Sequence, residues 1–188
     1  MNAVTGTKSV TADDIVEVAG RIVDAHGADA LTMRRLADEL GVAVTSIYWH
    51  VGNRDELVDA LVDRLIADMG TVRARGTTPR ERIASLARAM RKKLLERPQL
   101  VALAHERART PAMFQPVQEA IARELAVMGL PDDETALALR ALQLHVVTSV
   151  LLVRSLDRYG ALEPVDAAEV FEFTLAAMLD ALEARGRA

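Results

Sequence analysis

One stretch constrains this chain more than any other: residues 31–57, which read LTMRRLADELGVAVTSIYWHVGNRDEL. Two short segments with helical apolar periodicity lie on either side of Gly41, and Thr32 is placed to cap the first. Gly41 supplies the positive φ that a tight turn between helices needs. The small Ala37 allows the two helices to cross closely, and the branched Ile47 docks the second helix onto the first. These spacings predict a helix-turn-helix, with an ordinary helical hairpin as the alternative.

Composition sets the limits for the rest of the chain. Its 188 residues are 51% hydrophobic, enough to bury one sizeable core or a small domain beside a larger one. There is no cysteine, so disulfides and thiolate metal sites are excluded. The N-terminus lacks the apolar core of a signal peptide, and the longest apolar-rich run, 141–153, is shorter than the about 20 residues of a membrane span. We expect a soluble, cytoplasmic protein with no membrane partner, cofactor or bound metal.

The charge balance restricts how the chain can bind nucleic acid. The net charge is −4, which argues against coating nucleic acid by bulk charge. Residues 1–54 hold five Lys or Arg against seven Asp or Glu. A DNA contact must therefore come from a small patch with the acids turned away, which a helix placed in a groove can provide.

Periodicity and capping residues predict an all-α fold in two domains, residues 1–54 and 55–188, with no strand pattern. Thr11 is expected to cap the first helix, Asn53 the fourth and Thr78 the fifth, with residues 71–78 as a linker. The predicted helices outside the central motif cover about 12–26, 54–69, 79–97, 99–107, 111–128, 133–158 and 166–185.

The last two predicted helices are apolar on more than one side. Such helices are buried on several faces, and a symmetric dimer interface is one explanation. Burial at the centre of a single-chain bundle is the other. The expected interface residues are Leu144, Val147, Leu151, Phe171, Leu175, Met178 and Leu182.

The first 70 or so residues resemble the TetR (tetracycline-repressor) family of bacterial transcriptional regulators. The segments LTMRRLADELGV, TSIYWHV and NRDELVDAL carry the resemblance, whereas the C-terminal part resembles the family only in its helical layout. The resemblance implies an N-terminal helix-turn-helix DNA-binding domain of three helices, joined by a fourth helix to a C-terminal helical ligand-binding and dimerisation bundle. It implies a homodimeric repressor that a small-molecule effector releases from a palindromic operator on double-stranded DNA.

The second helix of the motif, about Val44 to His50, is expected to present its first residues to base edges in the major groove. Their methyl and hydroxyl groups suit thymine methyls and small polar contacts, and Arg34 is the best candidate for a strong contact. The resemblance implies base contacts at Arg34, Val44, Thr45, Ser46, Tyr48 and Trp49, and phosphate contacts at Thr32, Tyr48, His50 and Arg54. As alternatives, Tyr48 buttresses the helix, Trp49 belongs to the core and His50 closes the helix end.

The resemblance also implies an effector pocket in the C-terminal domain. Its mostly apolar candidates favour an apolar or aromatic effector. The candidate lining residues are Met90, Leu94, Leu103, His105, Phe114, Val117, Leu142, His145 and Val146.

Three alternative functions stay open. A tetracycline-type repressor would use His105 and His145 at a drug–magnesium site, although Val153 stands where a carboxylate should complete the metal shell. His145 is equally explained as a hydrogen-bonded core or interface residue. An effector-free DNA-binding module is the second alternative. An enzyme is the third, and we expect no catalytic activity, because His105-Glu106 is followed by Arg109 rather than the second histidine of a zinc-protease motif.

Overall fold

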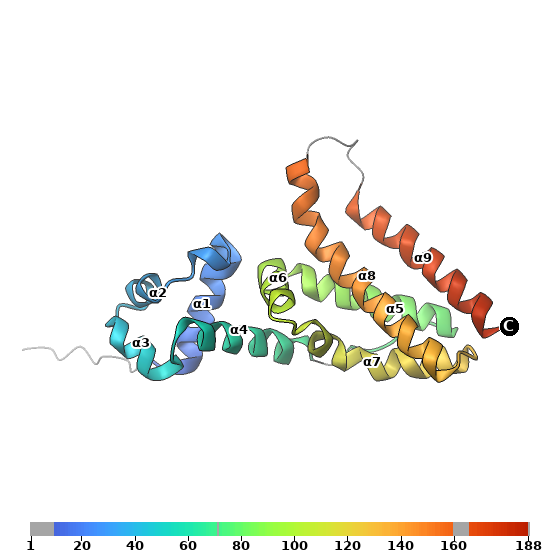
Figure 1. Cartoon of the computed structure of the whole chain (residues 1–188), viewed down its shortest axis with the longest axis horizontal. Helices are drawn as coiled ribbons and strands as arrows, with labels where there is room; N and C mark the ends of the chain where they lie inside the picture. Colours follow the sequence, from blue (N-terminus) through green and yellow to red (C-terminus); the bar gives the residue numbers. More distant parts are fainter. Residues whose placement is uncertain (1–9, 71, 160–165, 188) are drawn as a thin grey trace, which may run out of the picture. The chain divides into compact units, whose positions relative to one another are not determined.

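The computed structural model describes residues 10–70, 72–159 and 166–187, without the side chains of 153–159. Within these ranges the chain forms α-helices and one short 3-10 helix, with no strand, as Figure 1 shows. The all-α fold class predicted from the sequence is confirmed. The elements are α1 Ala12–His26, η1 Ala28–Ala30, α2 Met33–Leu40, α3 Val44–Val51, α4 Arg54–Met69, α5 Pro79–Leu95, α6 Pro98–Glu106, α7 Thr110–Val127, α8 Asp132–Tyr159 and α9 Ala167–Gly186.

The residues group into two compact units, Met1–Arg64 and Leu65–Ala188. The division falls inside α4, so the first unit contains α1 to α3 and most of α4. The second unit contains α5 to α9.

Capping side chains begin the helices where the sequence predicts. Thr11 and Thr78 each form a reciprocal capping box, with Asp14 and Glu81 as their partners. Asn53 Oδ1 accepts hydrogen bonds from the N–H groups of the two residues that follow Arg54, at 2.8 and 3.0 Å. These caps satisfy N–H groups that have no partner within the helix, which fixes each helix start.

The first unit packs α1 against both helices of the central motif. α1 contacts α2 and α3, which also contact each other. Each of the four helices contributes fully buried side chains to this core, as expected from their apolar periodicity. The least exposed are Ile15, Ala19, Val23, Leu36, Ala37, Ile47, Leu57 and Val62.

The second unit is built around α5 and α8. Both helices contact α6, α7 and α9, and they also contact each other, while α8 and α9 run antiparallel in Figure 1. The apolar side chains between these helices form a packed core. Its fully buried members include Ile83, Leu86, Met90, Leu94, Met113, Val117, Leu125, Val150, Phe171 and Leu175.

Helix α8 is longer than the apolar run that the sequence analysis considered. Its segment Asp132–Leu152 has the length and composition of a membrane span, a property shared by core helices of soluble proteins. One side of this segment packs into the second unit, and its first turn carries three acids. The chain itself buries 33% of this segment, and one helix of this length and composition is weak evidence for a membrane span.

Candidate nucleic-acid interface and ligand pocket

The turn between α2 and α3 depends on the backbone conformation of Gly41. Its φ of 67° lies in the left-handed region, and its N–H donates to the Asp38 carbonyl at 3.3 Å. A Cβ added at Gly41 would meet nothing within 4 Å. Conformation rather than space therefore requires glycine here. The helix-turn-helix predicted from the sequence is confirmed, with Thr32 Oγ1 accepting from Arg35 N–H at 3.1 Å.

Helix α3 is attached to the first unit through one buried side chain and presents most of its remaining surface outward. Ile47 is 0% exposed, whereas Trp49 is 88% exposed and Tyr48 is 50% exposed. The alternative in which Trp49 belongs to the core is therefore wrong. Two large aromatic side chains held outward on a short, docked helix are available to a macromolecular partner.

The other residues expected at the DNA lie around this helix. Thr32, Arg34, Thr45 and His50 are exposed, and Val44 and Ser46 are half-buried at the first turn of α3. They come from the start of α2 and the length of α3, two helices in mutual contact.

Arg54 has a role that the sequence did not indicate. Its Nε donates to the Leu31 carbonyl and its Nη2 to the Ala28 carbonyl, each at 3.0 Å. These bonds tie the start of α4 to the segment that leads into α2. The guanidinium therefore braces the helix-turn-helix in the free protein. The sequence could not predict this contact, because the partners of Arg54 are backbone carbonyl groups more than twenty positions away.

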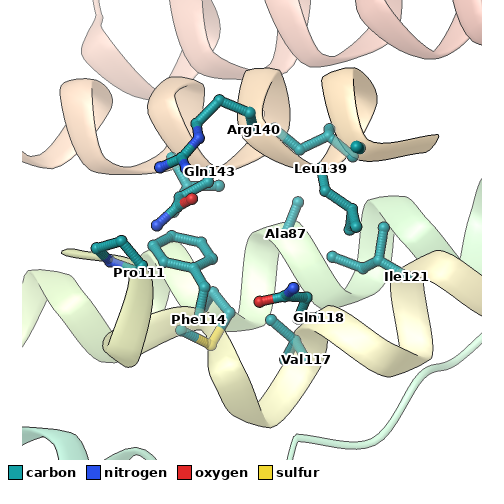
Figure 2. A pocket seen from close by; sticks show the side chains of 13 residues that line it. Ala87, Pro111, Phe114, Val117, Gln118, Ile121, Leu139, Arg140 and Gln143 are labelled. Carbon is teal, nitrogen blue, oxygen red and sulfur yellow. The ribbon is translucent and has the colours of Figure 1, made fainter. Parts of the chain in front are cut away.

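A cavity with a volume of about 280 Å³ lies between α5, α7 and α8, and Figure 2 shows its side chains. Five of the nine predicted pocket residues line it. These five are Met90, Phe114, Val117, Leu142 and Val146. The remaining lining residues are Ala87, Pro111, Gln118, Ile121, Ala136, Leu139, Arg140 and Gln143.

The structure does not bring the other four candidates to this cavity. Leu94 and Leu103 are core residues, 0% and 7% exposed. His105 Nδ1 lies 3.0 Å from Thr110 Oγ1 at the junction of α6 and α7. His145 packs on α9 instead, and the side chain of Val153 lies outside the described residues. The two histidines of the drug–metal alternative are thus attached to different helix junctions.

His145 belongs to a stacked cluster between α5, α8 and α9. Its ring stacks on Phe171 with centroids 4.7 Å apart and an interplanar angle of 4°. The guanidinium of Arg91 lies 4.8 Å from the Phe171 centroid. The Nε2 atom of His145 lies 3.2 Å from the Phe171 carbonyl oxygen and from Thr174 Oγ1. Burial is the main cause that lowers the pKa of His145, and the positive charge of Arg91 lowers it further.

The polar members of the cavity were missed by sequence reasoning. The sequence analysis singled out neither Gln143 nor Arg140 as a pocket residue. Their signal is positional: Leu139, Gln143 and Val146 follow the 3.6-residue period of the helix face that lines the cavity. Arg140 precedes Gln143 by three positions and reaches the same cavity.

The residues expected at a dimer interface differ in how far the chain itself buries them. Val147, Phe171, Leu175 and Leu182 are buried within the chain itself, and Leu151 and Met178 are half-buried. Only Leu144 is largely exposed, at 51%. The sequence did not single out the other exposed apolar residues of these helices. These are Leu137 and Leu152 on α8, and Val170 and Phe173 on α9.

The geometry defines a class of protein: a helix-turn-helix unit with an outward aromatic helix, followed by a helical unit with an internal pocket. Sequence profiles match both parts. Residues 15–61 match the bacterial regulatory proteins of the tetR family, and residues 74–163 match the tetracyclin repressor-like C-terminal domain. The chain belongs to the TetR family of bacterial regulatory proteins.

Individual relatives extend over most of this chain. It is 33% identical over 155 residues to the HTH-type transcriptional repressor Rv1353c of Mycobacterium tuberculosis, covering 78% of this chain and 58% of the relative. The chain thus spans about three fifths of the length of the curated relatives it matches first. BioQ from Mycobacterium smegmatis has a TM-score of 0.73 at 30% identity, covering 94% of this chain and 99% of BioQ. Apo ActR from Streptomyces coelicolor has a TM-score of 0.73 at 28% identity, covering 95% and 97%.

Proposed function

We propose that this protein is a cytoplasmic transcriptional repressor that binds a palindromic operator as a homodimer and is released by a small molecule. The observation that carries the proposal is α3, which buries Ile47 and holds Tyr48 and Trp49 outward. Beside this helix, Thr32, Arg34 and Arg54 are proposed to contact the phosphates or bases of the DNA. Within the helix, the further proposed DNA contacts are Val44, Thr45, Ser46 and His50. An outward helix of this kind fits the major groove.

Complexes of the structural relatives support both halves of the proposal. BioQ has been solved with its natural double-stranded DNA operator, at 28% identity to this chain and a TM-score of 0.69. ActR has been solved with actinorhodin, at 28% identity and a TM-score of 0.72. The first supports operator binding by α3, and the second supports a small molecule as effector.

Release would follow from a shift between conformations. Two half-sites on one face of DNA need recognition helices about 34–36 Å apart. An effector that fits the pocket better in a conformation with another spacing lowers the fraction of dimer that can bind. The pocket walls come from three helices, so a ligand in it contacts α5, α7 and α8 together.

The role of α3 is tested by selecting operators from random or genomic DNA and measuring affinity by fluorescence anisotropy. We expect Trp49→Ala and Tyr48→Ala each to weaken operator binding at least tenfold. Arg21→Ala is the matched control, because Arg21 is exposed on α1 and pairs with Glu17 four residues before it. No preference for a two-half-site palindrome over random DNA would refute the proposal.

The phosphate role of Arg54 has its own test, because this residue also braces α2. Each neutralised phosphate steepens the salt dependence of binding by about 0.9 in log–log slope. We expect Arg54→Ala to make the slope shallower by about that amount. A weaker affinity with an unchanged slope would mean that Arg54 acts only through its bonds to Ala28 and Leu31.

A further inference from the structure

The pocket between α5, α7 and α8 is chemically uneven. Most of its wall is apolar, including Met90 from α5, Val117 from α7 and Leu142 from α8. Gln143 departs from this pattern. Its residue is 9% exposed, and its Nε2 amide group has no hydrogen-bond partner among the described residues. A buried donor without a partner costs about 1–3 kcal/mol of folding free energy. Because this amide lines a cavity, we infer that a ligand in the cavity accepts its hydrogen bond.

Arg140 adds a charge to the same side of the cavity. It lies one helical turn before Gln143 on α8 and lines the same pocket. Figure 2 shows the Gln143 amide pointing from α8 toward Phe114, with the Arg140 side chain running along α8 beside it. Arg140 is the only charged residue among the thirteen that line the pocket, and no carboxylate is among them. Arg140 is exposed at the edge of the pocket and, unlike Arg80, Arg82 and Arg88, forms no ion pair with any other described residue. An unneutralised guanidinium beside an amide donor suits a carboxylate.

We propose that the effector is a small aromatic carboxylate. Its ring system occupies the apolar end, and its carboxylate accepts hydrogen bonds from Gln143 and Arg140. The cavity of about 280 Å³ is at the small end of ligand pockets, which suits one ring or a fused pair. Phe114 supplies an aromatic wall for it. This inference rests on the proposed function, because it names the ligand class of the same pocket.

Calorimetric titration of the full chain tests the charge requirement. The ligands are benzoate, 2-naphthoate and 2-anthracenecarboxylate, each compared with its uncharged primary alcohol. We expect at least one carboxylate to bind tenfold or more tightly than its alcohol. Failure of all three carboxylates to bind, or equal affinity for acid and alcohol, would overturn the proposal.

Variants assign the preference to the named side chain. Arg140→Gln should remove the preference for carboxylate over alcohol, because it should lower the affinity for the acid far more than the affinity for the alcohol. Arg123→Gln is the matched control, because Arg123 is an exposed arginine of α7 outside the pocket lining and pairs with Glu119. A preference that survives in Arg140→Gln would overturn the role of Arg140.

Gln143→Leu separates ligand binding from a purely structural role. Leucine fills similar space and removes the unpaired amide, so the ligand-free protein should melt at the same or a higher temperature. The affinity for the carboxylate should fall at least fivefold. A lower melting temperature with unchanged affinity would show that Gln143 is a structural residue and overturn its assignment.

Operator binding distinguishes this inference from the proposed function. The titration needs no DNA, so the ligand class is judged by itself. If the carboxylate binds through Arg140 but leaves operator affinity unchanged, the ligand class holds and release by this effector fails. If operator DNA is released only by compounds without an acidic group, the ligand class fails and the proposed function holds.

Discussion

At the scale of single residues, Ile47 and Trp49 have opposite roles although only one residue separates them. Ile47 is 0% exposed and docks α3 on the first unit, while Trp49 is 88% exposed. Truncating Ile47 removes packed atoms and leaves a cavity. We expect Ile47→Ala to lower the free energy of unfolding by about 2–5 kcal/mol, measured by chemical denaturation.

Trp49→Ala is the natural comparison for that experiment. An exposed side chain contributes little to the folded state, so its unfolding free energy should change by less than about 0.5 kcal/mol. Its operator affinity should nevertheless fall. A large loss of stability in Trp49→Ala would contradict the exposed position of the ring.

Arg54 connects residue chemistry to the conformation of the motif. Its charged guanidinium donates hydrogen bonds to the carbonyls of Ala28 and Leu31, and both hydrogen bonds are at least partly exposed to solvent. We expect Arg54→Gln to lower the free energy of unfolding by about 1 kcal/mol. Arg34→Gln is the control, since Arg34 is exposed at the start of α2 and should change stability by less than about 0.5 kcal/mol. Equal losses in both variants would contradict the bracing role.

At the scale of helices, the sequence predicts where elements begin better than which side they bury. Caps such as Thr11 and Thr78 act on N–H groups within three residues, so their effect is visible locally. The φ of Gly41 is likewise a local requirement. For this reason, most of the predicted helix ends lie within about two residues of the ends in the structure.

The buried faces of α8 and α9 could not be predicted from the sequence, because these helices are apolar on most sides. Periodicity gives no preferred face when nearly every position is apolar, so the assignment depends on neighbours distant in sequence. Phe171 and Phe173 illustrate this, since the first is 2% exposed and the second 77% exposed. The polar end of the pocket was missed for the same reason. Gln143 is recognised as a pocket residue only when the three-dimensional structure shows that it lines the same cavity as residues of α7.

The stacked His145 predicts a pH dependence of the packing between α8 and α9. Burial lowers its pKa in the folded chain below the ordinary value of about 6.5. The unfolded chain therefore binds more protons in this range. The stability that neutral His145 contributes is fully present above about pH 6.5. It is lost as the pH falls through the lowered folded-state pKa. Thermal unfolding followed from pH 7.5 to 5 should show this decline.

Other charged groups around the ring define the control. The charges of Arg91 on α5 and Glu172 on α9 act on the His145 ring, and Glu172 also forms an ion pair with Arg88 of α5 at 2.6 Å. This pair lowers the pKa of Glu172, so the stability that the carboxylate contributes is fully present above the ordinary carboxyl pKa and is lost as the pH falls through the lowered folded-state pKa. His145→Gln removes titration at this site and should flatten the decline between pH 6.5 and 5. An equal decline in both proteins would assign it to another group.

At the scale of the whole molecule, the proposed dimer has to cover an apolar surface that the chain leaves exposed. Leu137, Leu144 and Leu152 recur at seven- or eight-residue spacing on α8 and share one face. Val170 and Phe173 are exposed on the antiparallel α9. Two adjacent helices with such stripes can pack against a symmetry-related pair as a four-helix bundle. Of the interface residues predicted from the sequence, Leu144 lies on this surface. The other four exposed residues were not among those predicted.

Placing a charge in this surface tests the dimer and its link to operator binding. Phe173 is 77% exposed, so Phe173→Glu should not disturb the fold of the chain. A carboxylate buried between subunits would cost several kcal/mol, and we expect a monomer at micromolar concentration by analytical ultracentrifugation. Val127→Glu is the matched control, since Val127 is 69% exposed on α7, a helix that carries neither stripe. That variant should remain dimeric.

The same pair of variants relates assembly to function. A monomer presents one recognition helix, so Phe173→Glu should lose its preference for a two-half-site operator while keeping weak binding to single half-sites. The loss should shrink as protein concentration rises, because assembly depends on concentration. If Phe173→Glu stays dimeric, α8 and α9 do not form the interface. If it becomes monomeric yet binds the palindrome as tightly as Val127→Glu, the two half-sites are not read by a preformed dimer.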